Sequence, residues 1–582
     1  MCGIVGYVGE KRPVDILILG LKALEYRGYD SAGIALKSGN DLQIIKSVGK
    51  IEKLEEKLKK TNLITGNLGI GHTRWATHGE PNENNAHPHN VGDVTLVHNG
   101  IIENSSLIKQ KLINEGLSFK SDTDTEVACA LINYYYDGDE VMAIEKAIKE
   151  LKGSYAFGIV FSSSDKLYAV RKGSPLIVGL SDSGNFIASD IMAIIDYTNK
   201  YVLLNEDEIA IISDKNVDIL KNGKKVKYNV LKADITAEDR DKSGYSHYML
   251  KEIMEEPILL EKTLDNCLKK IDQLPNLNSY EEIHIVACGS ALYAGMIGKS
   301  LLEEKTSLHV LCDVASEYRY RNIVYDRKTL VILVSQSGET ADTIAAMCKA
   351  KESGVDTLAI VNVKTSTIAR ESDKQIFIEA GPEIAVATTK AYILQVAIFS
   401  LLACKASGCL DDLEVKKLPR YVKEVLDNRD AYLAIAKKIY KHNDIFFIGR
   451  KIDYAISLEG SLKLKEVSYI HSEAYQAGEL KHGTISLIDS NMPVFGIITD
   501  DSIRKKTISN IEEVKSRGAD IIIVTNEKVL GYDNQIIVPK ISEFFEPLLV
   551  VPALQLIAYE TANLRGCDID KPKNLAKSVT VE

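Results

Sequence analysis

Short apolar runs separated by turn residues occupy the chain from its start to about residue 230. Runs rich in Val, Ile and Tyr predict β-strands. The clearest are Ile4–Val8, Val94–Val97, Tyr155–Phe161, Leu167–Val170 and Leu176–Gly179. They follow one another too closely for a helix between each pair. The pattern therefore favours mixed α/β layers over a parallel sheet.

A different pattern begins after the polar segment 232–246, which is the best candidate for a linker. From there, apolar strand, glycine turn and long helix follow one another at 281–304 and again at 443–466. Segments 351–362 and 515–526 also resemble each other. Both pairs are offset by about 160 residues, which predicts a duplicated βαβ domain, although two α/β segments can also match by chance.

Some runs in this second region are apolar at every position, such as Leu330–Val334 and Ile521–Val524. Strands of this kind are typical of doubly wound parallel sheets, because helices cover both faces. The boundaries predicted from these changes of pattern are domain 1–231, linker 232–246, domain 247–410, inter-domain helix 411–440, domain 441–570 and tail 571–582.

The composition of the 582 residues is that of an ordinary globular protein, with 45% hydrophobic and 26% charged residues. The net charge of -10 argues against a nucleic-acid binder. Nine Cys without a C-x-x-C pair indicate neither a disulfide framework nor a zinc site. We see no signal peptide and no apolar stretch of about 20 residues that could span a bilayer, so we expect a soluble, reduced, cytoplasmic protein.

Cys2 is separated from the amino terminus by Met1 alone. Removal of Met1 would place a thiol and an α-amine on one residue. The α-amine has an unperturbed pKa of roughly 7.7–8.0, so it can accept a proton near neutral pH. A base carried by its own nucleophile is one way to activate that nucleophile. Cys2 is therefore a candidate catalytic residue.

Five of the eleven His and the only Trp lie between Gly71 and Gly100. A metal site is one interpretation, but no His pair has the i, i+4 spacing of a zincin, and we predict no metal. The alternative is amide hydrolysis, with the Asn99 side chain and the Gly100 N–H as an oxyanion hole. Arg74 could pair with a substrate α-carboxylate and Asp124 with an α-ammonium, which points to glutamine.

Five segments of the first 126 residues together resemble the N-terminal-nucleophile glutamine amidotransferases: Met1–Gly6, Glu25–Gly33, His72–Gly79, His98–Gly100 and Ser121–Glu126. The resemblance implies an αββα sandwich. It also implies that Trp75, Thr77, His78 and His87 join Arg74 and Asp124 in binding glutamine. Several enzymes share parts of this set, so it identifies the nitrogen donor and not the acceptor.

The second region offers a candidate phosphate site at residues 335–340, after an apolar strand and before a helix at 341–352. Ser335, Ser337 and Thr340 supply hydroxyls, and a helix N-terminus attracts anions. An ordinary Ser-rich helix cap is the alternative, and the segment lacks the Lys of a nucleotide P-loop. In the second copy Asp500 and Asp501 stand at the matching place and would repel a phosphate. We therefore expect phosphate binding in the first copy only.

Two further segments carry candidate chemistry. Glu459, Lys463 and Glu466 recur at i, i+4 and i+7, which would place them on one helix face that could simply be solvated. The tail 571–582 carries Lys577 near its centre among apolar residues, which is unusual for a frayed end.

Six segments together resemble the sugar isomerase domains of the glutamine–fructose-6-phosphate aminotransferase (isomerising) family: Cys288–Ser290, Ser335–Thr340, Glu383–Thr388, Lys463–Glu466, Glu479–His482 and Asn574–Glu582. The resemblance covers essentially the whole chain. It implies conversion of D-fructose 6-phosphate and L-glutamine to D-glucosamine 6-phosphate and L-glutamate, the first step of hexosamine (UDP-N-acetylglucosamine) synthesis. It further implies a homodimer without a cofactor, and ammonia passing between domains with Trp75 as its gate.

The resemblance also implies roles for individual residues. Lys577 would form an imine with the open-chain ketone, His482 would assist ring opening, and Glu466 would move the proton between C1 and C2. The sugar phosphate would be bound by Ser290, Ser335, Gln336, Ser337, Thr340, Val386, Thr388 and Lys463. Ala291 departs from the family pattern, which commonly has a hydroxyl residue there, and Thr388 stands where Ser is expected.

Two alternatives remain at this point. A phosphoribosyl-pyrophosphate amidotransferase would need an acidic pyrophosphate-binding motif, and we find none in the second region. A regulator that senses sugar phosphates would have no need of Cys2, Asn99 and Asp124. The short linker also leaves little room for a regulatory segment, which argues against inhibition by a nucleotide sugar.

Overall fold

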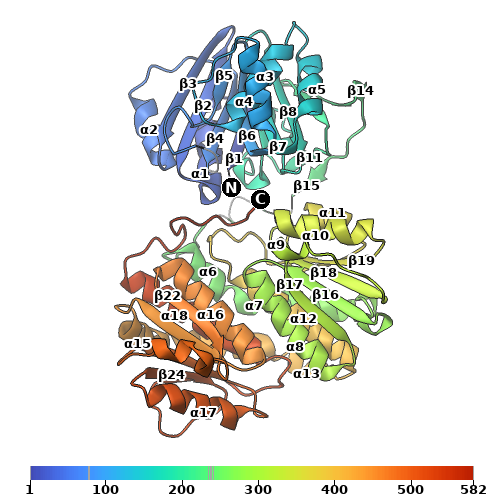
Figure 1. Ribbon diagram of the computed structural model, residues 1–582. Coiled ribbons are helices and arrows are strands. Elements are labelled where there is room, and N and C mark those ends of the chain that lie inside the picture. The colour runs from blue at the N-terminus through green and yellow to red at the C-terminus, as the bar shows by residue number, and fades with distance from the viewer. Residues whose placement is uncertain (1, 76–78, 234, 236–238, 240, 581–582) are drawn as a thin grey trace. The chain divides into compact units, whose positions relative to one another are not determined.

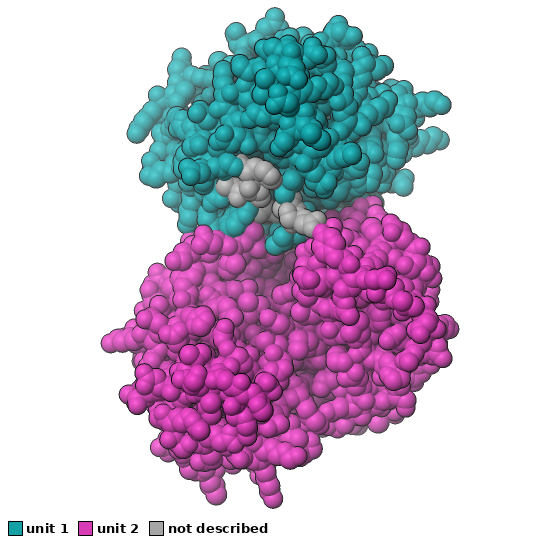
Figure 2. Space-filling model, viewed as in Figure 1, with its two compact units in different colours: residues 1–241, 578–582 teal, residues 242–577 magenta. Residues whose placement is uncertain are grey.

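The computed structural model describes residues 2–75, 79–233, 235, 239 and 241–580. The chain forms two compact units (Figure 2). Unit 1 comprises residues 1–241 together with 578–582, and unit 2 comprises residues 242–577. The boundary at Asp241 therefore lies within the polar segment 232–246.

Unit 1 contains two antiparallel sheets. In spatial order, the eight-stranded sheet consists of β15 (Leu231–Lys232), β11 (Lys200–Leu203), β9 (Ile177–Gly179), β10 (Gly184–Ala188), β1 (Gly3–Gly9), β4 (Leu68–Arg74), β2 (Ser31–Ser38) and β3 (Asp41–Val48). The seven-stranded sheet consists of β14 (Lys224–Lys225), β13 (Val217–Lys221), β12 (Ile209–Ile212), β8 (Leu167–Lys172), β7 (Gly153–Phe161), β6 (Val94–Ile102) and β5 (His89–Val91).

Helices cover the outer faces of both sheets, so unit 1 is a four-layer αββα sandwich. The helices are α1 (Pro13–Leu24), α2 (Ile51–Lys59), α3 (Ser105–Asn114), α4 (Asp124–Tyr135) and α5 (Glu140–Glu150). Ile4 and Ile187 of one sheet pack against Val97 and Ala156 of the other. The leucines and isoleucines of α1 fill the outer face of the first sheet, and α3 to α5 cover the second (Figure 1). The predicted mixed layers are confirmed.

Unit 2 contains two five-stranded parallel sheets. The first has the order β17 (His309–Val314), β16 (Glu282–Ala287), β18 (Thr329–Ser335), β19 (Asp356–Val361) and β20 (Lys374–Phe377). The second has the order β22 (His471–Gln476), β21 (Asp444–Gly449), β23 (Pro493–Ile498), β24 (Asp520–Thr525) and β25 (Gln535–Ile537). The strand order is the same in both, which confirms the predicted duplication.

The helices of unit 2 are α6 (Tyr248–Met254), α7 (Glu256–Lys269), α8 (Ser290–Lys305), α9 (Ala315–Tyr318), α10 (Ala341–Glu352), α11 (Thr367–Glu371), α12 (Lys390–Ser407), α13 (Asp412–Val415), α14 (Leu418–Asp427), α15 (Arg429–Ile439), α16 (Ile452–Ser468), α17 (Arg504–Lys515) and α18 (Pro547–Leu564). One large core joins the inner faces of both sheets through α8, α12, α16 and α18. The outer faces are covered by α9 to α11 and by α17 (Figure 1).

The segment 411–440, predicted as one inter-domain helix, contains the three helices α13, α14 and α15. Pro419 lies in the first turn of α14, where its missing N–H costs nothing, and so it begins a new helix. Asn428, with a backbone outside the helical region, separates α14 from α15.

Two helices of unit 2, α12 and α18, are long and apolar enough to cross a membrane by length and composition. This corrects the expectation that no stretch of the chain reaches that length and hydropathy. In the structure 83% of α12 and 89% of α18 are buried inside the protein. Both are therefore core helices of unit 2.

Candidate active sites

The Cys2 thiol lies where the first strand of unit 1 begins and its neighbour ends. Gly3 of β1 is paired with Thr73 of β4, so the residues just beyond them meet. The Trp75 N–H donates a hydrogen bond to Cys2 Sγ at 3.3 Å. Burial raises the pKa of the Cys2 thiol, and the positive chain terminus and the Trp75 N–H only partly oppose this effect. The thiol thus needs a base to become a nucleophile.

The predicted oxyanion donors lie beside Cys2 on β6. Asn99 is buried, and its Nδ2 donates to the Cys2 carbonyl oxygen at 2.9 Å. Gly100 has a φ of +136°, and a Cβ there would lie 2.1 Å from the Ser154 carbonyl oxygen. Only glycine fits this close approach, so its N–H is not shielded by a side chain.

The residues predicted to hold the ends of glutamine are also buried near the sheet edge. Arg74 donates to the Gly79 carbonyl at 3.1 Å, and burial lowers the pKa of its guanidinium. Asp124 begins α4, and its Oδ2 accepts the Ile102 N–H at 2.8 Å. Trp75 is half-buried with the Tyr29 ring edge-on to it. The predicted residues Thr77 and His78 lie outside the described part of the chain.

Four buried histidines pack beneath these residues: His72, His87, His89 and His98. The rings of His72 and His87 are stacked with centroids 4.0 Å apart. Burial, with repulsion from neighbouring positive groups, lowers the pKa values of His87 and His89 well below the usual value. Among the described residues no group of three His, Cys, Asp or Glu is arranged to hold a metal ion.

In unit 2, the predicted phosphate loop joins β18 to α10. Ser335 Oγ accepts the Gly338 N–H at 3.0 Å and bonds to Thr340 Oγ1 at 2.9 Å. Gly338 has a φ of +65°, and a Cβ there would lie 2.0 Å from Ser366 Oγ. The glycine therefore lets the loop turn sharply, with the hydroxyls and the first N–H groups of α10 at one place.

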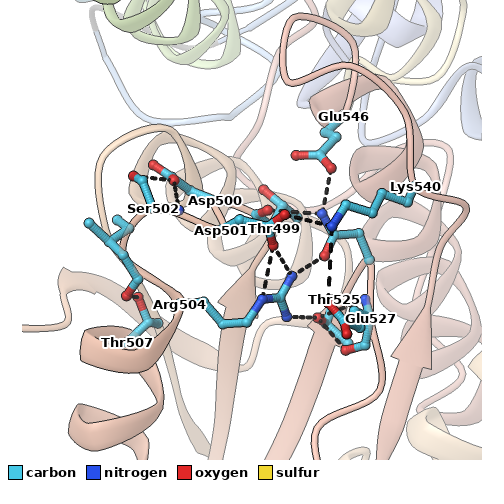
Figure 3. A network of polar contacts seen from close by, with 12 residues as sticks. Thr499, Asp500, Asp501, Ser502, Arg504, Thr507, Thr525, Glu527, Lys540 and Glu546 are labelled. Atoms are coloured by element: carbon cyan, nitrogen blue, oxygen red, sulfur yellow. Dashed lines mark hydrogen bonds and ion pairs between the residues drawn. The ribbon is translucent and has the colours of Figure 1, made fainter.

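The matching place of the second repeat is filled by the protein's own charges (Figure 3). Asp501 accepts hydrogen bonds from Arg504 at 2.8 Å and from Lys540 at 2.5 Å. Asp500 accepts the Ser502 N–H at 2.8 Å and lies 3.3 Å from Lys451 Nζ. The cations and the carboxylates at this place pair with one another.

The charged face of α16 is buried, so its interpretation as a solvated face is wrong. The side chains of Lys463 and Glu459 are 1% and 2% exposed. Lys463 Nζ lies 2.5 Å from Glu466 Oε2 and 3.6 Å from Glu459 Oε1, and Ser290 Oγ of α8 donates to Glu459 at 3.1 Å. Burial raises the pKa of Glu459 to about 7. Glu459 is thus a further candidate residue of this group.

Lys577 forms a buried ion pair with Glu383. The Glu383 carboxylate also accepts the Thr388 hydroxyl at 2.6 Å and the N–H groups of Thr389 and Ala391 at 3.0 and 3.1 Å. Burial alone would raise the pKa of Glu383, but Lys577 and these donors lower it to about 2. Directly before the tail, the Asp570 carbonyl accepts the Val386 N–H.

Glu252 of α6, which sequence reasoning did not single out, lies against the same loop. Its Oε1 accepts the N–H groups of Ile384 and Ala385 at 2.5 and 3.2 Å. Burial and the neighbouring charge of Glu383 raise the pKa of Glu252 to about 8. An acidic residue in a short helix has no periodicity that marks it as buried, so only the tertiary structure identifies it.

His482 stands apart from the other predicted sugar-site residues. It is exposed at the end of a single 3-10 turn, Leu480–His482, and its N–H donates to the Glu479 carbonyl. Within the described part of the chain, its side chain makes no hydrogen bond or ion pair with the Glu383 or Lys463 groups. The structure brings together Ser290 with the α16 charges and Thr388 with Lys577, but not His482 with either.

Known proteins resemble both units. A glutamine amidotransferase domain model matches residues 72–196, and a SIS domain model matches residues 276–405 and 438–529. Glutamine–fructose-6-phosphate aminotransferase [isomerizing] of Clostridium tetani is 46% identical over 612 residues, covering all of both chains. The enzyme of the same name from Thermus thermophilus is 44% identical over 605 residues, again covering both chains completely.

Among solved structures, the C-terminal domain of glucosamine-fructose-6-phosphate aminotransferase from Francisella tularensis has a TM-score of 0.53 and 35% identity. It covers 57% of this chain and is itself covered completely. The glucosamine-6-phosphate deaminase of Thermotoga maritima follows with a TM-score of 0.50 and 25% identity, over 58% of this chain and 100% of its own.

We expect the stability of the Glu252→Gln variant, relative to that of the wild type, to increase as the pH rises from 5 to 8. The pKa of Glu252 is raised to about 8 in the folded protein, above the value of about 4.3 in an unfolded chain. The folded state binds this proton more tightly, so the associated stability is present at low pH and is lost as the pH rises toward 8. Gln cannot ionise and avoids that loss.

Melting temperatures of both proteins, measured at several pH values, test this expectation. Glu261→Gln, at an exposed position of α7, is the matched control and gives the effect of replacing an exposed Glu by Gln at each pH. A Glu252→Gln difference that stays constant or shrinks between pH 5 and 8 would contradict the assignment of a buried, protonated Glu252.

Proposed function

Since the chain belongs to the glutamine–fructose-6-phosphate aminotransferase (isomerising) family, we propose that it converts L-glutamine and D-fructose 6-phosphate to L-glutamate and D-glucosamine 6-phosphate. One observation carries this proposal. The same chain holds Cys2 beside two oxyanion donors in unit 1 and an amine, Lys577, buried among hydroxyls and carboxylates in unit 2. The Cys2 thiol can cleave an amide, and the Lys577 amine can condense with a ketone.

In the glutaminase half, Cys2 Sγ attacks the side-chain amide carbon of glutamine. The α-amine, exposed after removal of Met1, takes the thiol proton and returns it to the leaving ammonia. Asn99 Nδ2 and the Gly100 N–H stabilise the oxyanion, each contributing roughly 10²–10³ in rate. Water then hydrolyses the thioester and releases glutamate. Arg74 and Asp124 hold the α-groups, and the remaining contacts to glutamine are from Trp75, Thr77, His78 and His87.

In the isomerase half, the loop after β18 holds the phosphate through Ser335, Gln336, Ser337 and Thr340. Lys577 forms an imine with C2 of the open-chain sugar and releases water. This step needs a neutral amine, so Lys577 first gives a proton to the Glu383 carboxylate, which returns it to the oxygen that leaves as water. Ammonia then displaces Lys577 from the imine carbon. Glu466 moves the proton between C1 and C2, His482 assists ring opening, and Ser290, Val386, Thr388 and Lys463 complete the sugar site.

Free ammonia would be lost to solvent, so we propose that it passes through the protein from Cys2 to the sugar, with Trp75 as the gate. Trp75 is half-buried, follows Arg74 in the sequence and donates its backbone N–H to Cys2 Sγ, and this position supports the role of a gate. We assign glutamine hydrolysis to residues 1–231, the sugar isomerase domains to 247–410 and 441–570, and the catalytic tail to 571–582. We further propose that the protein is a homodimer located in the cytoplasm.

Cys2→Ala, or an amino-terminal extension that survives processing, should lower glutamate release by roughly a thousandfold or more, because it removes the nucleophile or the α-amine. Conversion of fructose 6-phosphate to glucose 6-phosphate should continue, since its residues lie in unit 2. Coupled enzyme assays for glutamate and glucose 6-phosphate measure both. Cys409→Ala, at an exposed cysteine, is the control. Normal glutamate release by Cys2→Ala would rule out this nucleophile.

Lys577→Gln should abolish glucosamine 6-phosphate formation, because an amide cannot form an imine, while glutamine hydrolysis at Cys2 remains. Borohydride with fructose 6-phosphate should attach a reduced sugar to Lys577 of the wild type, detected by peptide mass spectrometry. Lys573→Gln, exposed in the same tail, should keep both the label and the product. A label on Lys463, Lys465 or Lys481 instead would move the imine to the second repeat and overturn the role of Lys577.

A further inference from the structure

The reaction proposed for unit 1 assigns no chemistry to His72, although it is fully buried directly beneath the oxyanion donors. His72 lies on β4, two residues before Arg74. Its Nε2 is 2.9 Å from the His98 carbonyl oxygen and 3.1 Å from Asn99 Oδ1. Burying an imidazole costs free energy unless its nitrogen atoms form hydrogen bonds. We therefore ask what the contacts of Nε2 do for the oxyanion donors.

The geometry determines where the hydrogens are. A backbone carbonyl oxygen only accepts, so His72 Nε2 must carry the hydrogen that it shares between its two partners. The Asn99 atom that faces Nε2 must then be an acceptor, which makes it Oδ1. At the other end of the amide, the Cys2 carbonyl oxygen also only accepts, and it receives Asn99 Nδ2 at 2.9 Å. Both ends require the same orientation of the amide.

His72 can keep this role across the working pH range because it does not titrate there. Burial lowers its pKa to about 3, so the ring stays neutral and carries a single hydrogen. Its Nδ1 has no hydrogen-bond partner among the described residues, as expected of the nitrogen without the hydrogen. The stacked His87 ring lies against the same imidazole.

We propose that His72 is a positioning residue of the glutamine site: its Nε2–H locks the Asn99 side chain with the amide nitrogen toward Cys2. One Nδ2 hydrogen goes to the Cys2 carbonyl, and the second is then available to the oxyanion. A flipped Asn99 would present an oxygen to that negative charge and repel it. This inference rests on the proposed glutamine hydrolysis at Cys2 and deepens it.

The test compares two replacements that carry the same amide group at different reach. In His72→Gln the amide nitrogen can occupy the place of Nε2, whereas in His72→Asn it ends near the place of Nδ1 and cannot reach Asn99. For glutamine hydrolysis, we expect Asn to lower kcat by about 10²–10³, as for loss of an oxyanion donor, with KM changed less than about threefold. Gln should restore at least about tenfold of that loss. His309→Asn, at an exposed histidine of unit 2, should leave kcat unchanged.

A double-mutant cycle with Asn99→Ala separates positioning from a general structural effect. If His72 acts through Asn99, adding His72→Asn to Asn99→Ala should lower kcat no further. The proposal would be overturned if His72→Asn lowered kcat by the same factor in the Asn99→Ala background as it does alone. Equal kcat values for the Gln and Asn variants at position 72 would also overturn it, and so would a loss seen only in KM. If the wild-type protein itself releases no glutamate from glutamine, the proposed function fails, and not the positioning role.

Discussion

The buried ion pair between Lys577 and Glu383 is the interaction on which the proposed sugar site depends. Glu383 is held by a cation, a hydroxyl and two backbone N–H groups at once, and its side chain is fully removed from water. Removing one partner from such a pair costs on the order of 3–5 kcal/mol, because the other charge stays buried and unpaired. The pair therefore fixes the chain at Lys577 against the core of unit 2. Glu252, whose pKa is raised to about 8 by burial and by the charge of Glu383, is a second buried carboxyl group against the same loop.

The two repeats of unit 2 show how one topology serves two purposes. Both have the same strand order and share a single core, so neither can be rearranged without the other. In the first repeat the turn after the third strand contains Gly338 and hydroxyls, which suit a phosphate. In the second, Asp501 takes that place and is neutralised by Arg504 and Lys540. The second repeat instead contributes α16, whose buried carboxylates flank Lys463.

Much of the architecture and the nucleophile could be predicted from the sequence. Continuously apolar runs such as Ile521–Val524 indicate strands covered on both faces, and their alternation with long helices indicates parallel sheets. Cys2 could be identified from the sequence because only Met1 precedes it, so that removal of Met1 would place a thiol and an α-amine on one residue. The sequence was less informative where tertiary packing decides: the i, i+4, i+7 spacing of Glu459, Lys463 and Glu466 is the same on a solvated and a buried face. Glu252 and His72 were missed for the same reason, since only the fold shows which atoms they meet.

In the proposed reaction, one chain hydrolyses glutamine and delivers the nitrogen to fructose 6-phosphate without releasing it. This delivery can be tested by incubating the protein with glutamine labelled with ¹⁵N in its amide, fructose 6-phosphate and an excess of unlabelled ammonium. We expect glucosamine 6-phosphate that carries the ¹⁵N label almost completely, with glutamate formed in equal amount. Glutamate without glucosamine 6-phosphate, or a product that carries the unlabelled nitrogen of the solution, would contradict it.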